Sequence, residues 1–141
     1  MHLRSYLEAD EQAVVNLWQA CDLTRPWNNT QKDIARKLEV QRELFLVGEV
    51  KARIVSTVMA GYDGHRGWIN YLAVHPDFCR QGIGSKLMDA AQTLLLELGC
   101  PKINLQVRSI NESAIAFYNS LGYVQDDVVS YGKRIIVDTA A

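Results

Sequence analysis

The sequence predicts an α/β fold of the α+β kind, in which a mixed and mostly antiparallel sheet is flanked by about four helices. Several segments repeat apolar residues at helical spacing, and short segments in the middle of the chain are rich in β-branched and aromatic residues. The strand Trp68–Val74, the long helix after Gly82 and the strand Lys102–Val107 also follow each other directly. The 141 residues contain no repeat and no Gly/Ser linker, so we expect one domain over residues 1–141.

The first third of the chain predicts one short strand and two helices. The strand covers Leu3–Tyr6, and the first helix covers Asp10–Cys21, where apolar residues recur at i, i+3, i+4 and i+7. The loop DLTRPWNN follows. Thr30 and Asp33 are spaced as in a capping box, which predicts a second helix from Thr30 to about Gln41.

The middle of the chain predicts a meander of antiparallel strands. Its strands are Glu43–Val50, Arg53–Tyr62 and Trp68–Val74, which are separated by a turn at Lys51 and by the turn sequence DGHRG.

A long helix is predicted after Gly82, followed by a strand and a further helix. The long helix has a continuous apolar face and ends at Gly99; the face consists of Ile83, Leu87, Ala90, Ala91, Leu94, Leu95 and Leu98. Lys102–Val107 predicts a strand. Asn111 is a good N-cap for the last helix, which ends at Gly122. The final segment VVSYGKRIIV reads as one bent strand or a hairpin.

Composition narrows the possible functions. A net charge of −1 argues against a general binder of nucleic acid or of a membrane surface. No segment reaches the ~18 apolar residues of a membrane span, and the N-terminus lacks the apolar core of a signal peptide, so we expect a cytoplasmic protein. The three widely spaced cysteines fit neither a disulfide framework nor a zinc site, and no metal is expected.

The sequence RQGIGS places two glycines at the start of the long helix. The first turn of a helix leaves backbone N–H groups without partners, and glycines let an anion come close to them. A phosphate or diphosphate suits such a site, although the glycines also suit a plain strand-to-helix turn. The segment lacks the third glycine of a dinucleotide fingerprint and the Gly-Lys-Ser/Thr of a P-loop.

Two longer stretches resemble a known family. INYLAVHPDFCRQGIGSKLM, followed by LQVRSINESAIAFYNSLGYV, is similar to the two central motifs of the Gcn5-related N-acetyltransferases, and especially of small bacterial members that resemble ribosomal-protein alanine acetyltransferases. The resemblance implies that two strands splay apart to hold acetyl-CoA. It assigns the pantetheine arm to the backbone of Leu72, Ala73 and Val74. It assigns the diphosphate to the amides of Gln81, Gly82, Ile83, Gly84 and Ser85, with Asn111 as a further contact.

The chain departs from the family pattern in its glycine loop. The family usually has Arg or Gln three residues before the first glycine, where this chain has Cys79, and the arginine is displaced to Arg80. We expect rearranged side-chain contacts from Arg80 and retained binding by the amides. Arg108 is expected to be a solvated surface charge, with a phosphate contact as the alternative.

The resemblance also assigns catalytic roles. Tyr118 occupies the position of the family's general acid, which protonates the departing thiolate, although helical spacing alone favours a core residue. Trp68–Val74 contains no carboxylate to act as the base, so we expect ordered water that is relayed by Asn70 or by backbone carbonyls. Histidine is a residue type suited to base catalysis, but His75 is expected to face away from the acceptor.

The sequence thus predicts direct acetyl transfer from acetyl-CoA to a primary amine, such as a protein N-terminus, a peptide or a small amine. The weak base favours an α-amine over lysine, and Arg25, Trp27 and Asn28 are candidates for contacting it. Alternatively, Pro26 and Trp27 only hold the helices together. The alternative functions are a coenzyme-A-binding module without turnover and a partner-binding domain. We expect a monomer or a homodimer.

Overall fold

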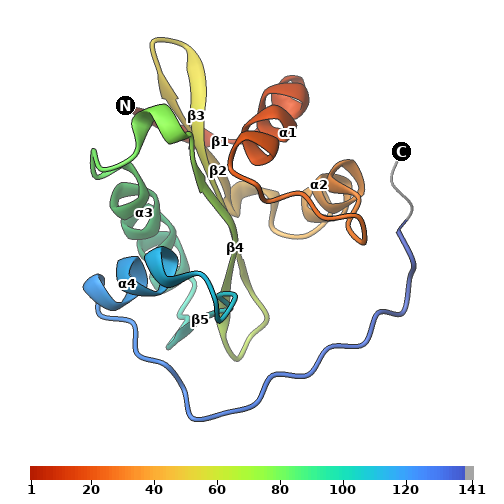
Figure 1. Cartoon of the computed structure of the whole chain (residues 1–141), viewed down its shortest axis with the longest axis vertical. Helices are drawn as coiled ribbons and strands as arrows, with labels where there is room; N and C mark the ends of the chain where they lie inside the picture. The colour runs from red at the N-terminus through yellow and green to blue at the C-terminus, as the bar shows by residue number, and fades with distance from the viewer. Residues whose placement is uncertain (139–141) are drawn as a thin grey trace.

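A five-stranded sheet organises the chain in the computed structural model, which describes residues 1–138 (Figure 1). The strands lie side by side in sequence order: β1 (His2–Ser5), β2 (Phe45–Val50), β3 (Arg53–Tyr62), β4 (Gly67–Val74) and β5 (Ile103–Leu105). Neighbouring strands are antiparallel except β4 and β5, which are parallel. The predicted mixed and mostly antiparallel sheet is therefore confirmed.

Two helices cover each face of the sheet. Helices α1 (Glu11–Ala20) and α2 (Thr30–Leu38) lie on one side of β4 in Figure 1, and α3 (Ile83–Glu97) and α4 (Glu112–Ser120) lie on the other. Short 3₁₀ turns, Glu8–Asp10, Arg42–Leu44 and Pro76–Phe78, connect the elements.

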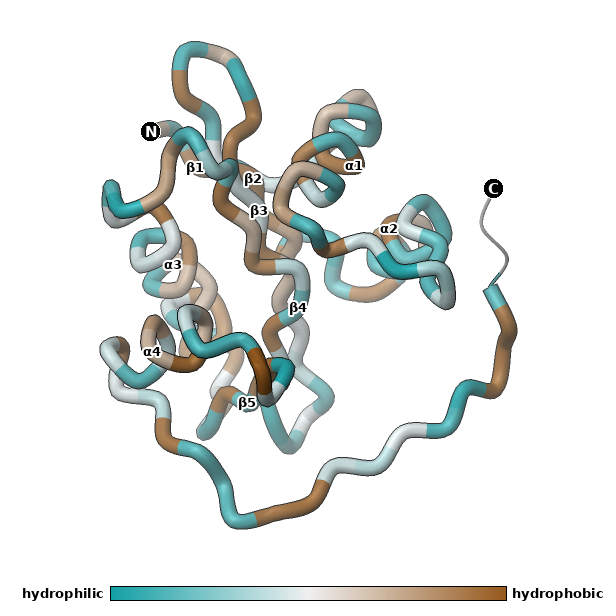
Figure 2. The backbone as a smooth tube through the Cα atoms, viewed as in Figure 1, coloured by the Kyte–Doolittle hydropathy of each residue, from teal (hydrophilic) through white to brown (hydrophobic). Residues whose placement is uncertain are grey.

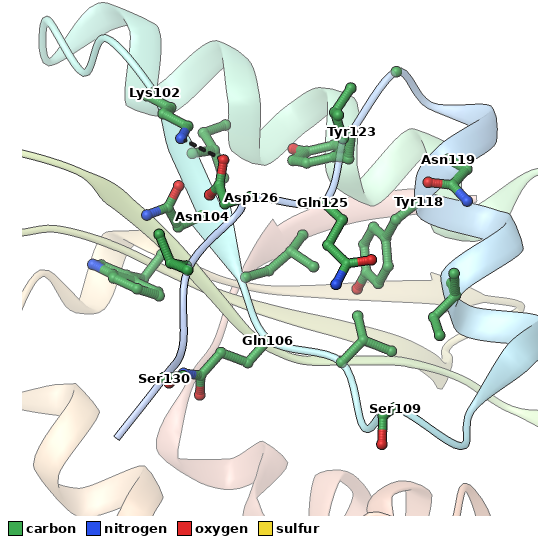
Figure 3. A pocket seen from close by; sticks show the side chains of 18 of the residues that line it. Lys102, Asn104, Gln106, Ser109, Tyr118, Asn119, Tyr123, Gln125, Asp126 and Ser130 are labelled. Carbon is green, nitrogen blue, oxygen red and sulfur yellow. Dashed lines mark hydrogen bonds and ion pairs between the residues drawn. The ribbon is translucent and has the colours of Figure 1, made fainter. Parts of the chain in front are cut away.

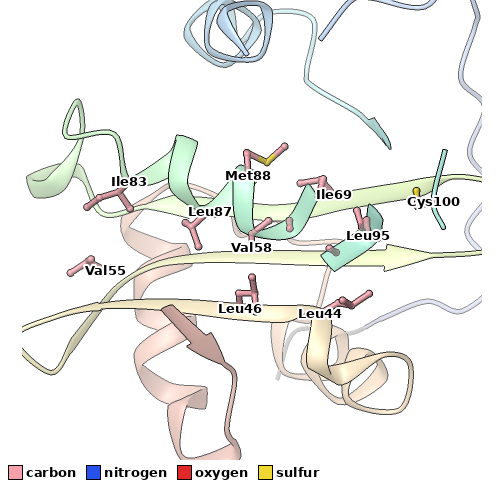
Figure 4. Packing of buried hydrophobic residues seen from close by; sticks show 12 residues of the cluster. Leu44, Leu46, Val55, Val58, Ile69, Ile83, Leu87, Met88, Leu95 and Cys100 are labelled. Atoms are coloured by element: carbon pink, nitrogen blue, oxygen red, sulfur yellow. The ribbon is translucent and has the colours of Figure 1, made fainter. Parts of the chain in front are cut away.

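The strands contribute side chains to two separate hydrophobic clusters, one on each face of the sheet, because successive side chains point to opposite faces. In β2, Leu46 packs with α3, whereas Phe45 and Val47 pack with α1 and α2. On α3, the buried side chains lie along one stripe (Figure 4); they are Ile83, Leu87, Met88, Ala91 and Leu95. Leu98 was predicted to belong to this stripe, but it is 49% exposed because it caps the helix beyond its last turn.

The second helix is capped one residue earlier than predicted. Asn29 is the N-cap, and its side-chain Oδ1 accepts a hydrogen bond from the backbone N–H of Lys32 at 3.1 Å. Thr30 is already helical, so the predicted capping box with Asp33 is wrong. The helix ends at Leu38, and Gln41, which was predicted inside it, has a left-handed backbone with φ of 53°.

The predicted C-terminal strand does not form. Residues 128–137 run as an extended segment without strand pairing, and Figure 2 shows apolar residues spaced along it. Their side chains are exposed, Tyr131 by 93%. β-Branched residues favour strands only where a neighbouring strand supplies ladder partners. The segment is held near its end by the ion pair of Asp138 with Arg36 at 2.6 Å.

Within residues 1–138, no helix has the length and apolar character that crossing a membrane requires.

Candidate active site

Strands β4 and β5 diverge and leave one edge of β4 open. They pair only over Gly67–Ile69 and Ile103–Leu105. Beyond Ile69, β4 keeps its pairing to β3 as far as Val74, but no described strand pairs with its other edge. This is the predicted pair of splayed strands, and it leaves Leu72, Ala73 and Val74 without a strand partner on this side in the described part of the chain.

A bulge at Tyr71 accompanies this divergence. Tyr71 has φ of 50°, and the register between β3 and β4 shifts between Thr57 and Met59. Strand alternation would place Tyr71 on the same face as Ile69, but it packs on the opposite face, where its ring stacks on Trp18 at 3.8 Å. Sequence patterns gave no sign of this bulge.

Buried hydrogen bonds hold the bulge. The Thr57 hydroxyl donates to the carbonyl oxygen of Tyr71 at 2.8 Å and accepts from the indole N–H of Trp18 at 2.9 Å. Trp18 and Thr57 are fully buried. A left-handed backbone at a bulky residue costs about 1–2 kcal/mol, which this arrangement offsets.

The N-terminus of α3 forms an open cradle of backbone amides. Gly82 is the N-cap with φ of 77°, and no side chain caps the helix. A Cβ added at Gly82 would meet no atom within 4 Å apart from its chain neighbours, so the space beside Gly82 is open. Exposed Gln81 and the amides of Ile83–Ser85 border it. The donors and the free space fit a diphosphate group.

Gly84 has a different role from Gly82. It lies inside the first turn of α3, and a Cβ there would lie 3.2 Å from Cζ of Phe117. The missing side chain therefore lets α4 pack closely against α3. Cys79 is exposed and its thiol lies 3.7 Å from the carbonyl oxygen of His75, so this departure from the family pattern sits beside the cradle.

A cavity of about 790 Å³ opens between β4, α2, α4 and the loop between α1 and α2. Of the predicted site residues, it gathers Asn70, Leu72, Tyr118 and Asn111. The remaining ones, Ala73, Val74, Arg80, Gln81, Gly82, Ile83, Gly84 and Ser85, do not line it and belong to the distal end of β4 and to the cradle.

A second cavity, of about 1060 Å³, lies between β5, α4 and the segment after α4 (Figure 3). Lys102 and Asp126 form an ion pair of 3.0 Å across it. Tyr118 lines this cavity as well as the first one.

Tyr118 is both a packed ring and an available hydroxyl. The ring makes edge contacts with Phe117 and Tyr123, at centroid distances of 5.1 and 5.8 Å. Within residues 1–138, no hydrogen bond occupies its hydroxyl. Burial, followed by the neighbouring Tyr123, raises the pKa of Tyr118 to about 12. The phenol holds its proton at neutral pH, as an ordinary tyrosine also does, so a proton is present on the hydroxyl.

Asn111 serves as the predicted N-cap of α4. Its Oδ1 accepts a hydrogen bond from the N–H of Ala114 at 3.1 Å. His75 lies outside the cavity, with its Nδ1 accepting a hydrogen bond from the N–H of Asp77 and its Nε2 3.2 Å from Arg53.

Asp33 is a carboxylate beside β4 that sequence reasoning missed. It lines the cavity from α2, and its Oδ2 accepts a hydrogen bond from the Tyr71 hydroxyl at 2.7 Å. Burial and this hydrogen bond raise the pKa of Tyr71. No local pattern could have revealed the contact, because it joins residues 38 positions apart and depends on the bulge.

The loop between α1 and α2, which was predicted to contact the acceptor, borders the same cavity. Arg25 and Asn28 line it. Trp27 is 49% exposed and lies under the guanidinium of Arg108.

Comparisons with known proteins agree with this geometry. Residues 6–123 match the model of the acetyltransferase (GNAT) family. A protein from Yersinia enterocolitica named only as an acetyltransferase is 47% identical over 138 residues, which is 98% of each chain.

Two solved structures have the same fold. Ard1 from Thermoplasma volcanium has a TM-score of 0.76 and 30% identity, over 87% of this chain and 82% of its own. The ribosomal-protein alanine N-acetyltransferase from Escherichia coli has a TM-score of 0.72 and 26% identity, over 86% of this chain and 76% of its own.

The hydrogen bonds of Thr57 predict a specific stability difference. Thr57→Val keeps the shape of the side chain but leaves the Trp18 N–H and the Tyr71 carbonyl without their partner. We expect the free energy of unfolding to fall by about 2–4 kcal/mol in urea denaturation. Thr57→Ser, which keeps the hydroxyl, is the control and should lose clearly less. Equal losses in the two variants would show that the hydroxyl does not hold the bulge.

Proposed function

The chain belongs to the acetyltransferase (GNAT) family, and from this premise we propose that it transfers an acetyl group from acetyl-CoA directly to a primary amine in the cavity beside β4. One observation carries the proposal. The open edge of β4 runs from the cavity lined by Tyr118 towards the amide cradle of α3, so a donor and an amine can meet at one end of the gap.

The donor site is assigned to backbone groups. In this proposal, Leu72–Val74 bind the pantetheine arm through the open edge of β4, and Gln81–Ser85 bind the diphosphate through the first-turn amides. Arg80, which has a left-handed backbone with φ of 62° just before the cradle, adds a positive charge near the phosphates. Because the amides supply the main contacts, Cys79 is compatible with binding.

The chemistry needs one proton donor and a path for one proton away from the amine. Acetyl-CoA supplies the acetyl group as a thioester, and its thiol is the leaving group. Tyr118 holds a proton on its hydroxyl, which it can give to that sulfur. Asn70, whose exposed side chain lines the cavity, is assigned to orient water that accepts the proton of the amine.

An α-amine is the acceptor group that this site favours. A lysine side chain with a pKa of ~10.4 loses its proton at pH 7 at a cost of about 4.6 kcal/mol, whereas an α-amine with a pKa of ~7.7–8.0 needs only about 1–1.4 kcal/mol. β4 carries no carboxylate, and Asp33 already accepts hydrogen bonds from Tyr71 and Arg36. The fold shared with the alanine N-acetyltransferase is consistent with a peptide N-terminus as acceptor.

The acceptor proposal is tested by release of free thiol. Peptides that differ only in a blocked α-amine or a blocked lysine are assayed side by side, and we expect the blocked α-amine to abolish turnover. Acetylation that survives this block but requires the lysine would contradict the preference. A protein that binds acetyl-CoA but turns over no amine would instead be a binding module.

Gly82→Ala tests the cradle. The added methyl group projects into the space assigned to the diphosphate and strains a left-handed backbone. We expect the Kd for acetyl-CoA, measured by calorimetry, to rise at least about 10-fold. Gly64→Ala is a matched control, because Gly64 also has positive φ and an open Cβ position but lies in the β3–β4 turn. Equal affinity in both variants would remove the cradle from the donor site.

Tyr118→Phe tests the proton donor. The substitution keeps the ring contacts with Phe117 and Tyr123 and removes only the hydroxyl. Because general acid catalysis contributes typically ~10²–10⁴-fold, kcat should fall by about this factor while Tm stays nearly constant. Turnover at the wild-type rate would assign Tyr118 to packing alone.

A further inference from the structure

We propose that the amine acceptor also carries a carboxylate, which binds to Arg108 while its amino group binds to Asp33. This inference rests on the proposed function and narrows its substrate class to peptides with an acidic group near the N-terminus. Asp33 comes from α2 and Arg108 from the loop between β5 and α4, and both line the cavity of about 790 Å³ that also contains Tyr118.

Most of the basic side chains that line this cavity already have partners within the protein. Its lining includes two acidic and four basic side chains: Asp22, Asp33, Arg25, Arg36, Lys37 and Arg108. Arg36 is bound by Asp138 and Asp33, and the Lys37 ammonium donates to the carbonyl of Ala60. Arg25 donates to the carbonyl oxygens of Asp22 and Thr24, both at 2.8 Å.

Arg108 is the exception among these basic side chains. In the part of the chain that the structure describes, no carboxylate lies within ion-pair distance of its guanidinium. The group lies over the Trp27 ring, 5.6 Å from the ring centroid. A guanidinium that lies over an aromatic ring is attracted to the ring face and can still donate its N–H groups, and its planar fork matches a carboxylate. The half-exposed Trp27 therefore acts as a platform for an anion-binding group.

Asp33 supplies the opposite charge next to β4. Its Oδ2 accepts from the Tyr71 hydroxyl at 2.7 Å, and its Oδ1 accepts from Arg36 at 3.2 Å. Each carboxylate oxygen has two lone pairs, so both retain capacity for another donor. The side chain is 24% exposed. Asp33 can therefore accept an N–H from the amine both before and after the amine loses its proton, and it acts as a positioning residue.

The test uses pairs of amines that differ only in a carboxylate. The pairs are the C-terminally amidated peptides Ala-Glu and Ala-Gln, and the C-terminally amidated peptides Ala-Asp and Ala-Asn. We expect wild-type kcat/KM to favour the carboxylate form of at least one pair by about 10- to 100-fold. Arg108→Gln should abolish this preference by raising KM for the acid form only, with KM for acetyl-CoA unchanged. Arg66→Gln, in the β3–β4 turn outside both cavities, is the control.

Asp33→Asn gives the second readout. It should raise KM for both members of the preferred pair while leaving their ratio and the KM for acetyl-CoA unchanged. A merely structural role of Asp33 would lower Tm and affect donor and acceptor alike.

Calorimetry of the same amines in the presence of coenzyme A measures the site without turnover. Carboxylate-dependent binding that Arg108→Gln removes supports the inference, and absence of turnover would then contradict only the proposed function. Equal binding within every pair overturns the inference. An Arg108→Gln variant that weakens acetyl-CoA binding instead also overturns it, because Arg108 would then contact the donor phosphates.

Discussion

The bulge at Tyr71 is the constraint on which the rest of the site depends. It moves the Tyr71 side chain from the face of Ile69 to the face of Trp18, in the strand segment where β4 leaves β5. Thr57 and Trp18 hold it from β3 and α1. This local change of register occurs where the edge of β4 is open. It also brings the Tyr71 hydroxyl to Asp33.

The two faces of the sheet consequently carry different parts of the proposed reaction. The face covered by α3 and α4 holds the amide cradle and Tyr118, and the face covered by α1 and α2 holds Asp33 and the Trp27 loop (Figure 1). β4 lies between them.

Features set by neighbouring residues could be predicted from the sequence. The meander, α3 and the turn at Gly82 follow from local periodicity and glycine conformation, and the resemblance added the splayed strands. Asn29 and Thr30 are both good cap residues, so the sequence alone could not choose between them. The bulge and the Asp33 contact depend on residues far apart in the chain. The C-terminal segment has the composition of a strand but pairs with no strand in the described part of the chain, which composition cannot reveal.

Titration of the protein with acetyl-CoA, followed by nitrogen–proton correlation NMR, tests the central claim most directly. If the donor lies along the open edge of β4 with its diphosphate on α3, the largest shifts will appear at the amides of Leu72–Val74 and Gln81–Ser85. Shifts concentrated at residues 124–130, beside the larger cavity, with the α3 amides unmoved, would contradict this account of the site.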